Sequence, residues 1–177
     1  MGDERPEGTP GMSGGSIAAG ARIGHVHLRV SDLERAMRFY RDRMGFDLLL
    51  RFGDEAAFLS AGGYHHHIGL NTWESAGGAP PPRGTTGLYH FAINYPERRD
   101  LAAALKRLLE GGWSIDGASD HGTHEAIYLH DPDHNGIELA WDRDPSEWPR
   151  RGESLTFTRR PLDFDGLMAE LGEPVPE

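Results

Sequence analysis

The sequence contains no cysteine. This excludes disulfides, thiolate metal sites and a cysteine nucleophile. Any metal would have to be held by histidine or carboxylate side chains, and ten histidines are present. Long apolar runs are also missing, since no stretch approaches the roughly 18 residues that a membrane-spanning helix requires. The N-terminus has no apolar signal segment either, so we expect a cytoplasmic protein.

Basic runs are absent as well. The chain carries 18 Lys and Arg residues against 28 Asp and Glu residues, which gives a formal net charge of −10. Such a chain does not attract nucleic acid or an anionic membrane, so neither is expected as a partner. The length of 177 residues predicts a single domain, which two small repeats could share.

Three segments differ in composition from the rest of the chain. Residues 1–21 are rich in Gly, Pro and Ser and are expected to form a disordered leader. Residues 75–85 contain three consecutive prolines and several glycines and are expected to form a linker. Residues 143–177 show no regular pattern beyond one short helical stretch, so we expect a C-terminal tail with a structural role. A paired domain is predicted for residues 22–142.

The paired domain repeats one order of elements. Its halves, 22–74 and 86–142, both read strand–helix–strand–strand–strand from the alternation of apolar residues and the positions of glycines. Neither half would bury enough apolar surface alone, so the sequence predicts an α+β domain in which the halves share a sheet. The first half should have strands at 23–30, 46–51, 56–60 and 64–72 and a helix at 32–43; the second should have strands at 87–95 and 113–116, a helix at 97–110 and a hairpin within 128–141.

The hairpin has the sequence YLHDPDHNGIELAW, from Tyr128 to Trp141. Its turn, DPDHNG, combines proline with Asp, Asn and Gly, all of which favour tight turns. In the strand that follows, alternation places Ile137 and Leu139 on one face and Glu138 on the other. The Glu138 carboxylate is therefore expected either in solvent or lining a cavity.

Three polar residues lie within predicted strands, on the face opposite an apolar row. They are His25, His90 and Glu138. Two imidazoles and one carboxylate are the ligand set of the facial triad, which binds non-haem Fe(II) and leaves coordination positions open. The alternative is that these are three unrelated polar residues on an exposed sheet face.

Three motifs, in order along the chain, carry a resemblance to a known family. They are GHVHLRVSDLERAMRFYRDRMGF, LYHFAINY and DPDHNGIEL. Through them the stretch 23–142 resembles the vicinal oxygen chelate superfamily, which includes glyoxalases, bleomycin resistance proteins and extradiol dioxygenases. The resemblance implies two βαβββ modules forming one cup-shaped mixed sheet, with helices on the outside. GYHHHIGLNTW, DHGTHEAIYLHDPDHNGIEL and WDRDPSEWP are most similar to catechol 2,3-dioxygenases of the extradiol type.

The resemblance assigns the metal ligands to His25, His90 and Glu138. They would hold Fe(II), with Mn(II) or Zn(II) as alternatives. Glyoxalase-type lyases commonly add a glutamate on the fourth strand of the first module, and that position is Gly69 here. The glycine favours a three-ligand iron site over a four-ligand zinc or nickel site.

The resemblance also assigns catalytic roles. Tyr128 would hydrogen-bond the deprotonated substrate oxygen, and His121 would position the substrate, with His124 as its competitor. The acid–base histidine falls on His66, whereas strict alternation prefers His65 or His67. His67 is also expected to contact the substrate. The alternative for this triple-histidine run is an exposed, polar strand end.

The implied activity is cleavage of a catechol ring by O₂, giving a ring-opened semialdehyde. Two other classes stay open: a lyase or isomerase that uses a non-redox metal, and a metal-free protein that binds small molecules. The large extradiol enzymes carry a second, non-catalytic pair of modules, whereas this chain has one pair. Either a homodimer supplies the missing walls of the pocket, or the pocket is more open.

Overall fold

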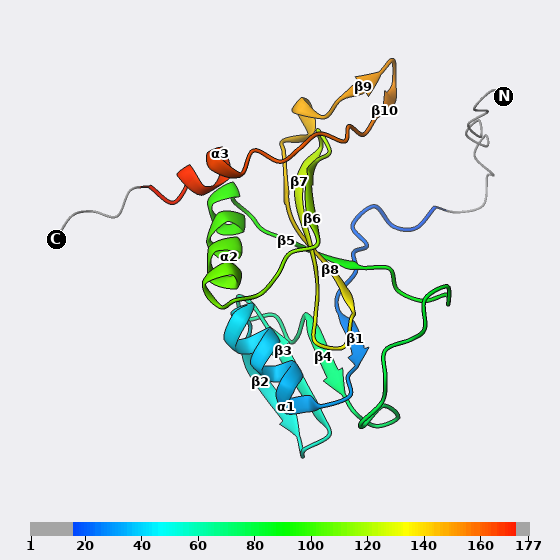
Figure 1. Ribbon diagram of the computed structural model, residues 1–177. Coiled ribbons are helices and arrows are strands. Elements are labelled where there is room, and N and C mark those ends of the chain that lie inside the picture. The colour runs from blue at the N-terminus through cyan, green and yellow to red at the C-terminus, as the bar shows by residue number, and fades with distance from the viewer. Residues whose placement is uncertain (1–15, 173–177) are drawn as a thin grey trace.

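The structure is a computed structural model that describes residues 16–172. Most of the predicted leader, residues 1–15, lies outside the described residues. The fold consists of two mixed four-stranded sheets, one from each half of the paired domain (Figure 1). The first half contains β1 (Val26–Arg29), α1 (Leu33–Met37), the π-helical η1 (Arg38–Arg43), β2 (Asp47–Phe52), β3 (Ala56–Ser60) and β4 (Ile68–Asn71), and the second contains β5 (Phe91–Asn94), α2 (Arg98–Glu110), β6 (Gly117–Asp120), β7 (His124–His130) and β8 (Gly136–Asp142).

The two sheets have the same topology. Their strand orders are β1-β4-β3-β2 and β5-β8-β7-β6. In each sheet the first strand pairs in parallel with the last strand of its module, and the other pairs are antiparallel. The predicted α+β class and the βαβββ modules are confirmed. The expectation of one continuous sheet needs correction, because in the described residues each module completes its own hydrogen-bonded ladder and β1 and β5 remain edge strands.

The helix of each module covers its sheet through one apolar face. Asp32 caps α1 by accepting a 2.9 Å hydrogen bond from the backbone N–H of Arg35. The helical stretch then continues as η1 and buries Phe39 and Tyr40. On α2 the buried apolar residues are Leu101, Ala102, Ala104, Leu105 and Leu108, whereas Leu109 lies at the edge of that face and is 50% exposed.

Several strand predictions were wrong in their bounds, including the strand expected at 23–30, because residues 23–25 precede β1. The short strand expected at 113–116 is absent, and β6 begins at Gly117, the residue that pairs with Tyr128. Residues 64–67 precede β4, and residues 87–90 precede β5. For the segment before β4, the reason is that its neighbour β3 ends at Ser60 and the chain then turns through Gly62 and Gly63, both with positive φ.

The DPDHNG turn joins the two modules. The buried carboxylate of Asp131 accepts hydrogen bonds from the backbone N–H groups of Asp133 and Asn135, which fixes the turn. Its other oxygen accepts a 2.9 Å hydrogen bond from the hydroxyl of Tyr40 in the first module. Asp133 in turn accepts from Arg35, also in the first module, at 2.6 Å. The turn between β7 and β8 is therefore docked on the helix of the other half.

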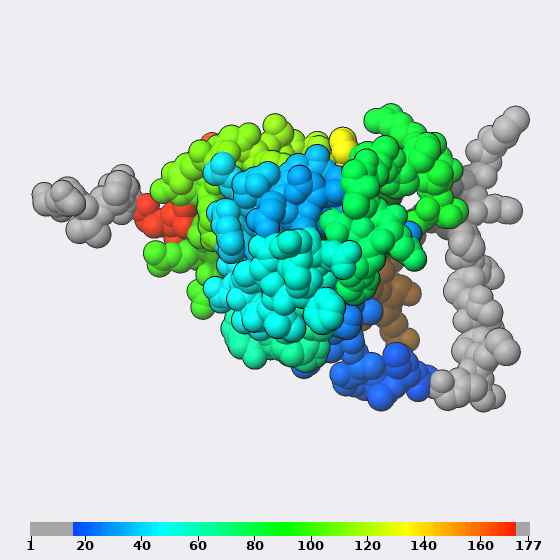
Figure 2. All heavy atoms as spheres, turned by 90° about the horizontal axis from the view of Figure 1, so that it is seen from below, coloured from blue at the N-terminus to red at the C-terminus, as the bar shows by residue number. Residues whose placement is uncertain are grey.

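The segments outside the sheets pack on both modules. The segment 75–85 starts against the first module, where Ser75 Oγ donates to the carbonyl of Val30 at 2.9 Å, and Figure 2 shows it beside that module. In the tail, η2 (Pro145–Glu147), β9 (Arg150–Arg151) and β10 (Ser154–Leu155) lead to α3 (Phe164–Ala169), which lies beside α2 (Figure 1). No helix within residues 16–172 has the length and apolar character to cross a membrane.

Candidate active site

Glu138 lies at the centre of the second sheet. It is opposite Ala92 of β5 on one side and opposite Tyr128 of β7 on the other. Its side chain is on the face away from Ile137 and Leu139, as alternation predicts, and the residue is only 7% exposed. The sequence left two environments open for the Glu138 carboxylate, solvent or a cavity. In the structure Glu138 lines a pocket.

Both oxygens of the Glu138 carboxylate face imidazoles. Oε2 lies 2.9 Å from Nε2 of His90, and Oε1 lies 3.1 Å from Nε2 of His124. His90 directly precedes β5, and His124 is the first residue of β7, so the strands on either side of β8 deliver one histidine each. A buried carboxylate requires such partners, because an unpaired buried charge is costly.

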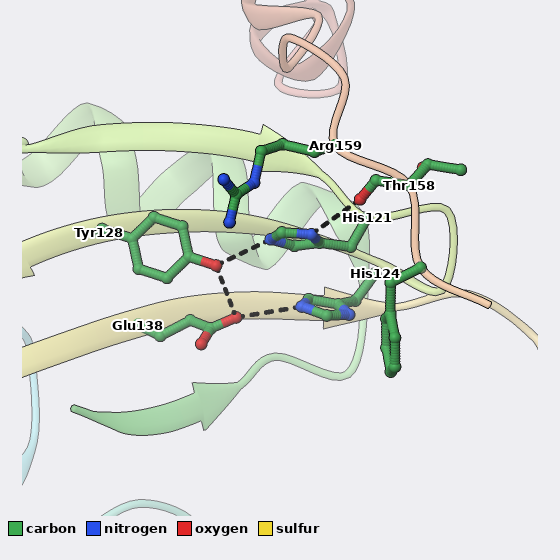
Figure 3. Close-up of a pocket in the computed structure, with 7 residues that line it drawn as sticks. His121, His124, Tyr128, Glu138, Thr158 and Arg159 are labelled. Atoms are coloured by element: carbon green, nitrogen blue, oxygen red, sulfur yellow. Dashed lines mark hydrogen bonds and ion pairs between the residues drawn. The ribbon is translucent and has the colours of Figure 1, made fainter. Parts of the chain in front are cut away.

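A hydrogen-bonded chain extends from Glu138 toward the tail (Figure 3). The hydroxyl of Tyr128 is 2.9 Å from Nε2 of His121 and 3.5 Å from Oε1 of Glu138. Nδ1 of His121 is 3.0 Å from the carbonyl oxygen of Thr158. Because a carbonyl only accepts, Nδ1 carries a proton, and in neutral His121 the Nε2 atom is left to accept from Tyr128.

The electrostatics of the pocket keep Glu138 charged and Tyr128 neutral. Burial by itself would raise the pKa of Glu138. The hydrogen bond and charge of His124, together with the charges of His90 and His121, outweigh burial, and the pKa of Glu138 falls below its usual value. Burial, followed by the charge of Glu138, raises the pKa of Tyr128 to about 12. At neutral pH the Tyr128 hydroxyl is therefore a hydrogen-bond donor beside a carboxylate.

The pocket has a volume of about 470 Å³, within the range of small-molecule sites. Four of its lining residues come from the second module, and the other three come from the tail. The tail residues are Phe157, Thr158 and Arg159, of which Figure 3 labels Thr158 and Arg159. Sequence reasoning gave the tail a structural role and missed these residues, because they follow no periodic pattern that would place them at β7 and β8. The lining from the second module consists of His121, His124, Tyr128 and Glu138.

The remaining predicted residues form a separate group in the first module. The rings of His25 and His66 have centroids 4.3 Å apart, and Nδ1 of His65 is 2.8 Å from Nδ1 of His66. Burial, with the charge of His25, lowers the pKa of His66. His67 points elsewhere, since its Nδ1 accepts from the backbone N–H of Ala61 at 3.3 Å.

The predicted ligand set is brought together only in part. His90 and Glu138 are in contact, whereas His25 is beside His65 and His66. Within residues 16–172, no group of three or more His, Cys, Asp or Glu side chains is arranged to hold a metal ion. Imidazole nitrogen and carboxylate oxygen are suitable ligands for Fe(II). Of the three predicted ligands, however, only His90 and Glu138 lie together in this arrangement.

Gly69 has a structural reason to lack a side chain. An ideal Cβ at this position would lie 2.9 Å from two ring atoms of His27, which is opposite it on β1. A glutamate at position 69 would therefore displace the His27 ring. The fourth carboxylate of glyoxalase-type lyases would need His27 to shift on this face of the sheet.

Comparison with known proteins identifies the family. The glyoxalase/bleomycin resistance protein/dioxygenase superfamily is matched over residues 22–139. A catechol-2,3-dioxygenase of Bacillus subtilis (strain 168) is 42% identical over 159 residues, covering 89% of this chain and 55% of the relative. Biphenyl-2,3-diol 1,2-dioxygenase 3 of Rhodococcus globerulus is 29% identical over 123 residues, covering 68% of this chain and 63% of the relative. The chain thus spans between about half and two thirds of the length of these relatives.

Solved structures share the fold. A glyoxalase/dioxygenase from Nostoc punctiforme matches with a TM-score of 0.60 at 20% identity, covering 75% of this chain and 100% of that chain. Lactoylglutathione lyase from Agrobacterium tumefaciens matches with a TM-score of 0.56 at 20% identity, covering 70% of this chain and 96% of that chain. At these identities the likeness shows the fold alone. With its two βαβββ modules and the continuous match over residues 22–139, this chain belongs to the glyoxalase/bleomycin resistance protein/dioxygenase superfamily.

Proposed function

We propose that this protein is an extradiol dioxygenase that opens the ring of a catechol with O₂ and forms a semialdehyde. One observation carries the proposal. The buried carboxylate of Glu138, with an imidazole on each oxygen, shares a pocket with the hydrogen-bonded pair Tyr128 and His121. The similarity to a catechol-2,3-dioxygenase at 42% identity supports the same reading.

Fe(II) is the proposed cofactor, with Mn(II) or Zn(II) as alternatives. His25, His90 and Glu138 are the proposed ligands, and the bound metal would acidify the diol and bring it together with O₂. His90 and Glu138 are already in contact. For His25 to join them, it would have to leave His65 and His66 or come from a second copy of the chain in a homodimer.

The chain's own side chains have separate tasks in this proposal. Tyr128, whose pKa is raised to about 12, keeps its proton and donates a hydrogen bond to a deprotonated substrate oxygen. His121 accepts from Tyr128 in the free pocket, and when Tyr128 turns to the substrate the Nε2 atom of His121 becomes free to accept a hydrogen bond from that substrate oxygen while the oxygen still carries its proton. The Tyr128 donor is half-buried in this pocket, and partial exclusion of solvent strengthens its hydrogen bond.

His66 is the proposed acid–base residue. Its lowered pKa makes it neutral near pH 7, so it can accept the proton of the second substrate hydroxyl. Its Nδ1 atom is in contact with His65, which leaves Nε2 as the atom that takes the proton. His67, whose ring lines a groove with His25, is the proposed additional substrate contact.

A metal-free protein that binds small molecules is the second candidate. It is favoured by one observation, the lack of a three-ligand group among residues 16–172. A glyoxalase-type lyase is disfavoured, because His27 occupies the space that a glutamate at position 69 would need.

Anaerobic loading with Fe(II), followed by elemental analysis, distinguishes these candidates. The dioxygenase should retain about one iron per chain and, on addition of catechol and O₂, form a yellow ring-fission product that is followed optically. Retention of iron without product from any of several catechols would reject ring cleavage. Failure to retain any metal would favour the binding protein.

A further inference from the structure

The tail supplies the pocket with a cation that the proposed reaction does not use. Arg159 lines the same pocket as Glu138, and its guanidinium extends over the pocket in the direction of Tyr128 and His121 (Figure 3). Tyr128 and His121 line this pocket together with Arg159. Arg159 is therefore close enough to act on whatever occupies the space beside Tyr128.

The residues on both sides of Arg159 form backbone hydrogen bonds with the end of β6 and the residue that follows it. Thr158 N donates to the carbonyl of His121 at 2.9 Å, and the carbonyl of Thr158 accepts from the His121 ring. Arg160 and Asp120 exchange two backbone hydrogen bonds, at 3.0 and 2.9 Å. Since residues 158 and 160 are both fixed by the neighbouring strand, the placement of Arg159 at the pocket is a property of the fold and does not depend on a free loop.

Arg159 also differs from Arg143 and Arg98, which are the ion-paired arginines around this sheet. Arg143 is paired with Asp120 and Glu125, and Arg98 is paired with Glu125. Arg159 forms no ion pair with any carboxylate in the described part of the chain. An unpaired guanidinium at the mouth of a pocket is suited to bind a ligand carboxylate through two parallel N–H···O bonds.

We infer that the preferred substrate is an aromatic diol bearing a carboxylate, with the diol toward Glu138 and the carboxylate held by Arg159. The inference rests on the proposed function for the diol end and on Arg159 alone for the acid end. The exposed ring of Phe157, two residues before Arg159, also lines the pocket and offers an apolar contact for the aromatic ring between these two ends. A neutral catechol would use only the diol end.

The binding test uses the full chain without metal and without O₂, so that it is independent of turnover. Calorimetry compares 3,4-dihydroxybenzoate, 2,3-dihydroxybenzoate and 3,4-dihydroxyphenylacetate with the methyl esters of the same acids. At least one acid should bind about tenfold more tightly than its ester, because only the acid forms a charge-assisted hydrogen bond with Arg159. The expected gain is no larger than this, since such a bond to a solvent-accessible arginine is weaker than a buried one. Equal binding of every acid and its ester would overturn the inference.

Three variants locate the effect. Arg159→Gln should remove the preference for the acid and leave ester binding within about twofold, and Arg159→Lys should retain part of it, because lysine keeps the charge without the planar fork. Arg160→Gln is the matched control, since Arg160 is the neighbouring exposed arginine and does not line the pocket. An equal loss for acid and ester in Arg159→Gln, or the same loss in Arg160→Gln, would contradict the assignment.

Turnover by the Fe(II)-loaded protein separates this inference from the proposed function. If the wild type cleaves catechol and acids with the same kcat/KM, the reaction class stands and the carboxylate preference fails. If no diol is cleaved but Arg159→Gln selectively loses acid binding, the preference stands and ring cleavage fails. If both hold, Arg159→Gln should lower the ratio of kcat/KM for the acid to kcat/KM for catechol about tenfold, whereas Arg160→Gln should leave that ratio unchanged.

Discussion

The hydroxyl of Tyr40, in the helix of the first module, donates a 2.9 Å hydrogen bond to the carboxylate of Asp131, 91 positions later in the sequence. Tyr40 is fully buried, and Asp131 is 3% exposed. Burial and the charge of Asp131 raise the pKa of Tyr40 well above its usual value, so the phenol keeps its proton. This pair attaches the hairpin that carries Glu138 to the other half of the domain.

Removing that hydroxyl should destabilise the fold. In Tyr40→Phe the buried Asp131 oxygen keeps its contact with Asn135 but loses the donor from the first module. We expect the free energy of unfolding, measured by urea denaturation, to fall by about 1–2 kcal/mol. Tyr89→Phe, at a position that is 90% exposed, is the control and should leave it unchanged. Equal stability of Tyr40→Phe and the wild type would show that the hydrogen bond does not contribute.

Iron binding should depend on Glu138 and His90. Glu138→Ala and His90→Ala are expected to lose stoichiometric iron in elemental analysis after anaerobic loading, because each removes one of two ligands in contact. The third ligand is decided by comparing His25→Ala with His124→Ala. Loss of iron only in His25→Ala supports the proposed set, whereas loss only in His124→Ala assigns the third position to the histidine that already touches Glu138.

The same experiment has a simple control. Glu147→Ala changes a glutamate in the exposed helix η2 and should retain iron. Full iron retention by Glu138→Ala would reject the metal assignment altogether.

Loss of the Tyr128 hydroxyl should reduce turnover without affecting the metal. The proposed role of Tyr128 is a hydrogen bond to a charged substrate oxygen, and such bonds contribute about tenfold to a hundredfold. We therefore expect kcat/KM for catechol cleavage in Tyr128→Phe to fall by about that factor, with iron content equal to the wild type. If Tyr128→Phe has the same kcat/KM as the wild type, the proposed hydrogen bond from Tyr128 to the substrate does not contribute to the reaction.

Acid stability should depend on Asp120, which holds the end of β6. Burial by itself would raise the pKa of Asp120, but the N–H of Gly122 and the guanidinium of Arg143 lower it below the usual value of 3.8. Since the folded state binds the proton less readily than the unfolded state, ionised Asp120 stabilises the fold. This contribution is complete above the unfolded pKa and is lost as the pH falls through the lower, folded pKa.

Urea denaturation at several pH values tests this dependence. Asp120→Asn should be less stable than the wild type by about 1 kcal/mol from pH 7 to 5, and the difference should shrink below about pH 4. Asp54→Asn, in an exposed turn, should track the wild type at every pH. A deficit for Asp120→Asn that persists unchanged at about pH 3 would show that the charge of Asp120 is not its source.

Local patterns in the sequence determined most of the elements. The strand Ala56–Ser60 has the predicted bounds, and the helix expected at 32–43 is present with its second half in a π-helical form. The DPDHNG turn and the alternation in IELAW placed Glu138 on the face opposite Ile137 and Leu139. These features depend on turn chemistry and on the two-residue period of a strand, which act between near neighbours.

The strand bounds that were wrong depended on longer contacts. The alternation before β4 continues to Tyr64, but a strand needs a partner, and β3 has already ended there. Likewise, β6 starts at Gly117 because that residue is opposite Tyr128 in the ladder. Sequence reasoning could not place these ends, because pairing partners are decided by register between strands.

The sequence by itself determined the family, the two modules and the donor types available to a site: histidine, carboxylate and phenol. Only the tertiary structure decided which of them meet. It set His124 as well as His90 against Glu138, left His25 beside His66, and brought the carbonyl of Thr158 to His121 across 37 positions. The physical reason is that such contacts depend on how strands and the tail pack in space, whereas the sequence pattern records only the face on which each side chain lies.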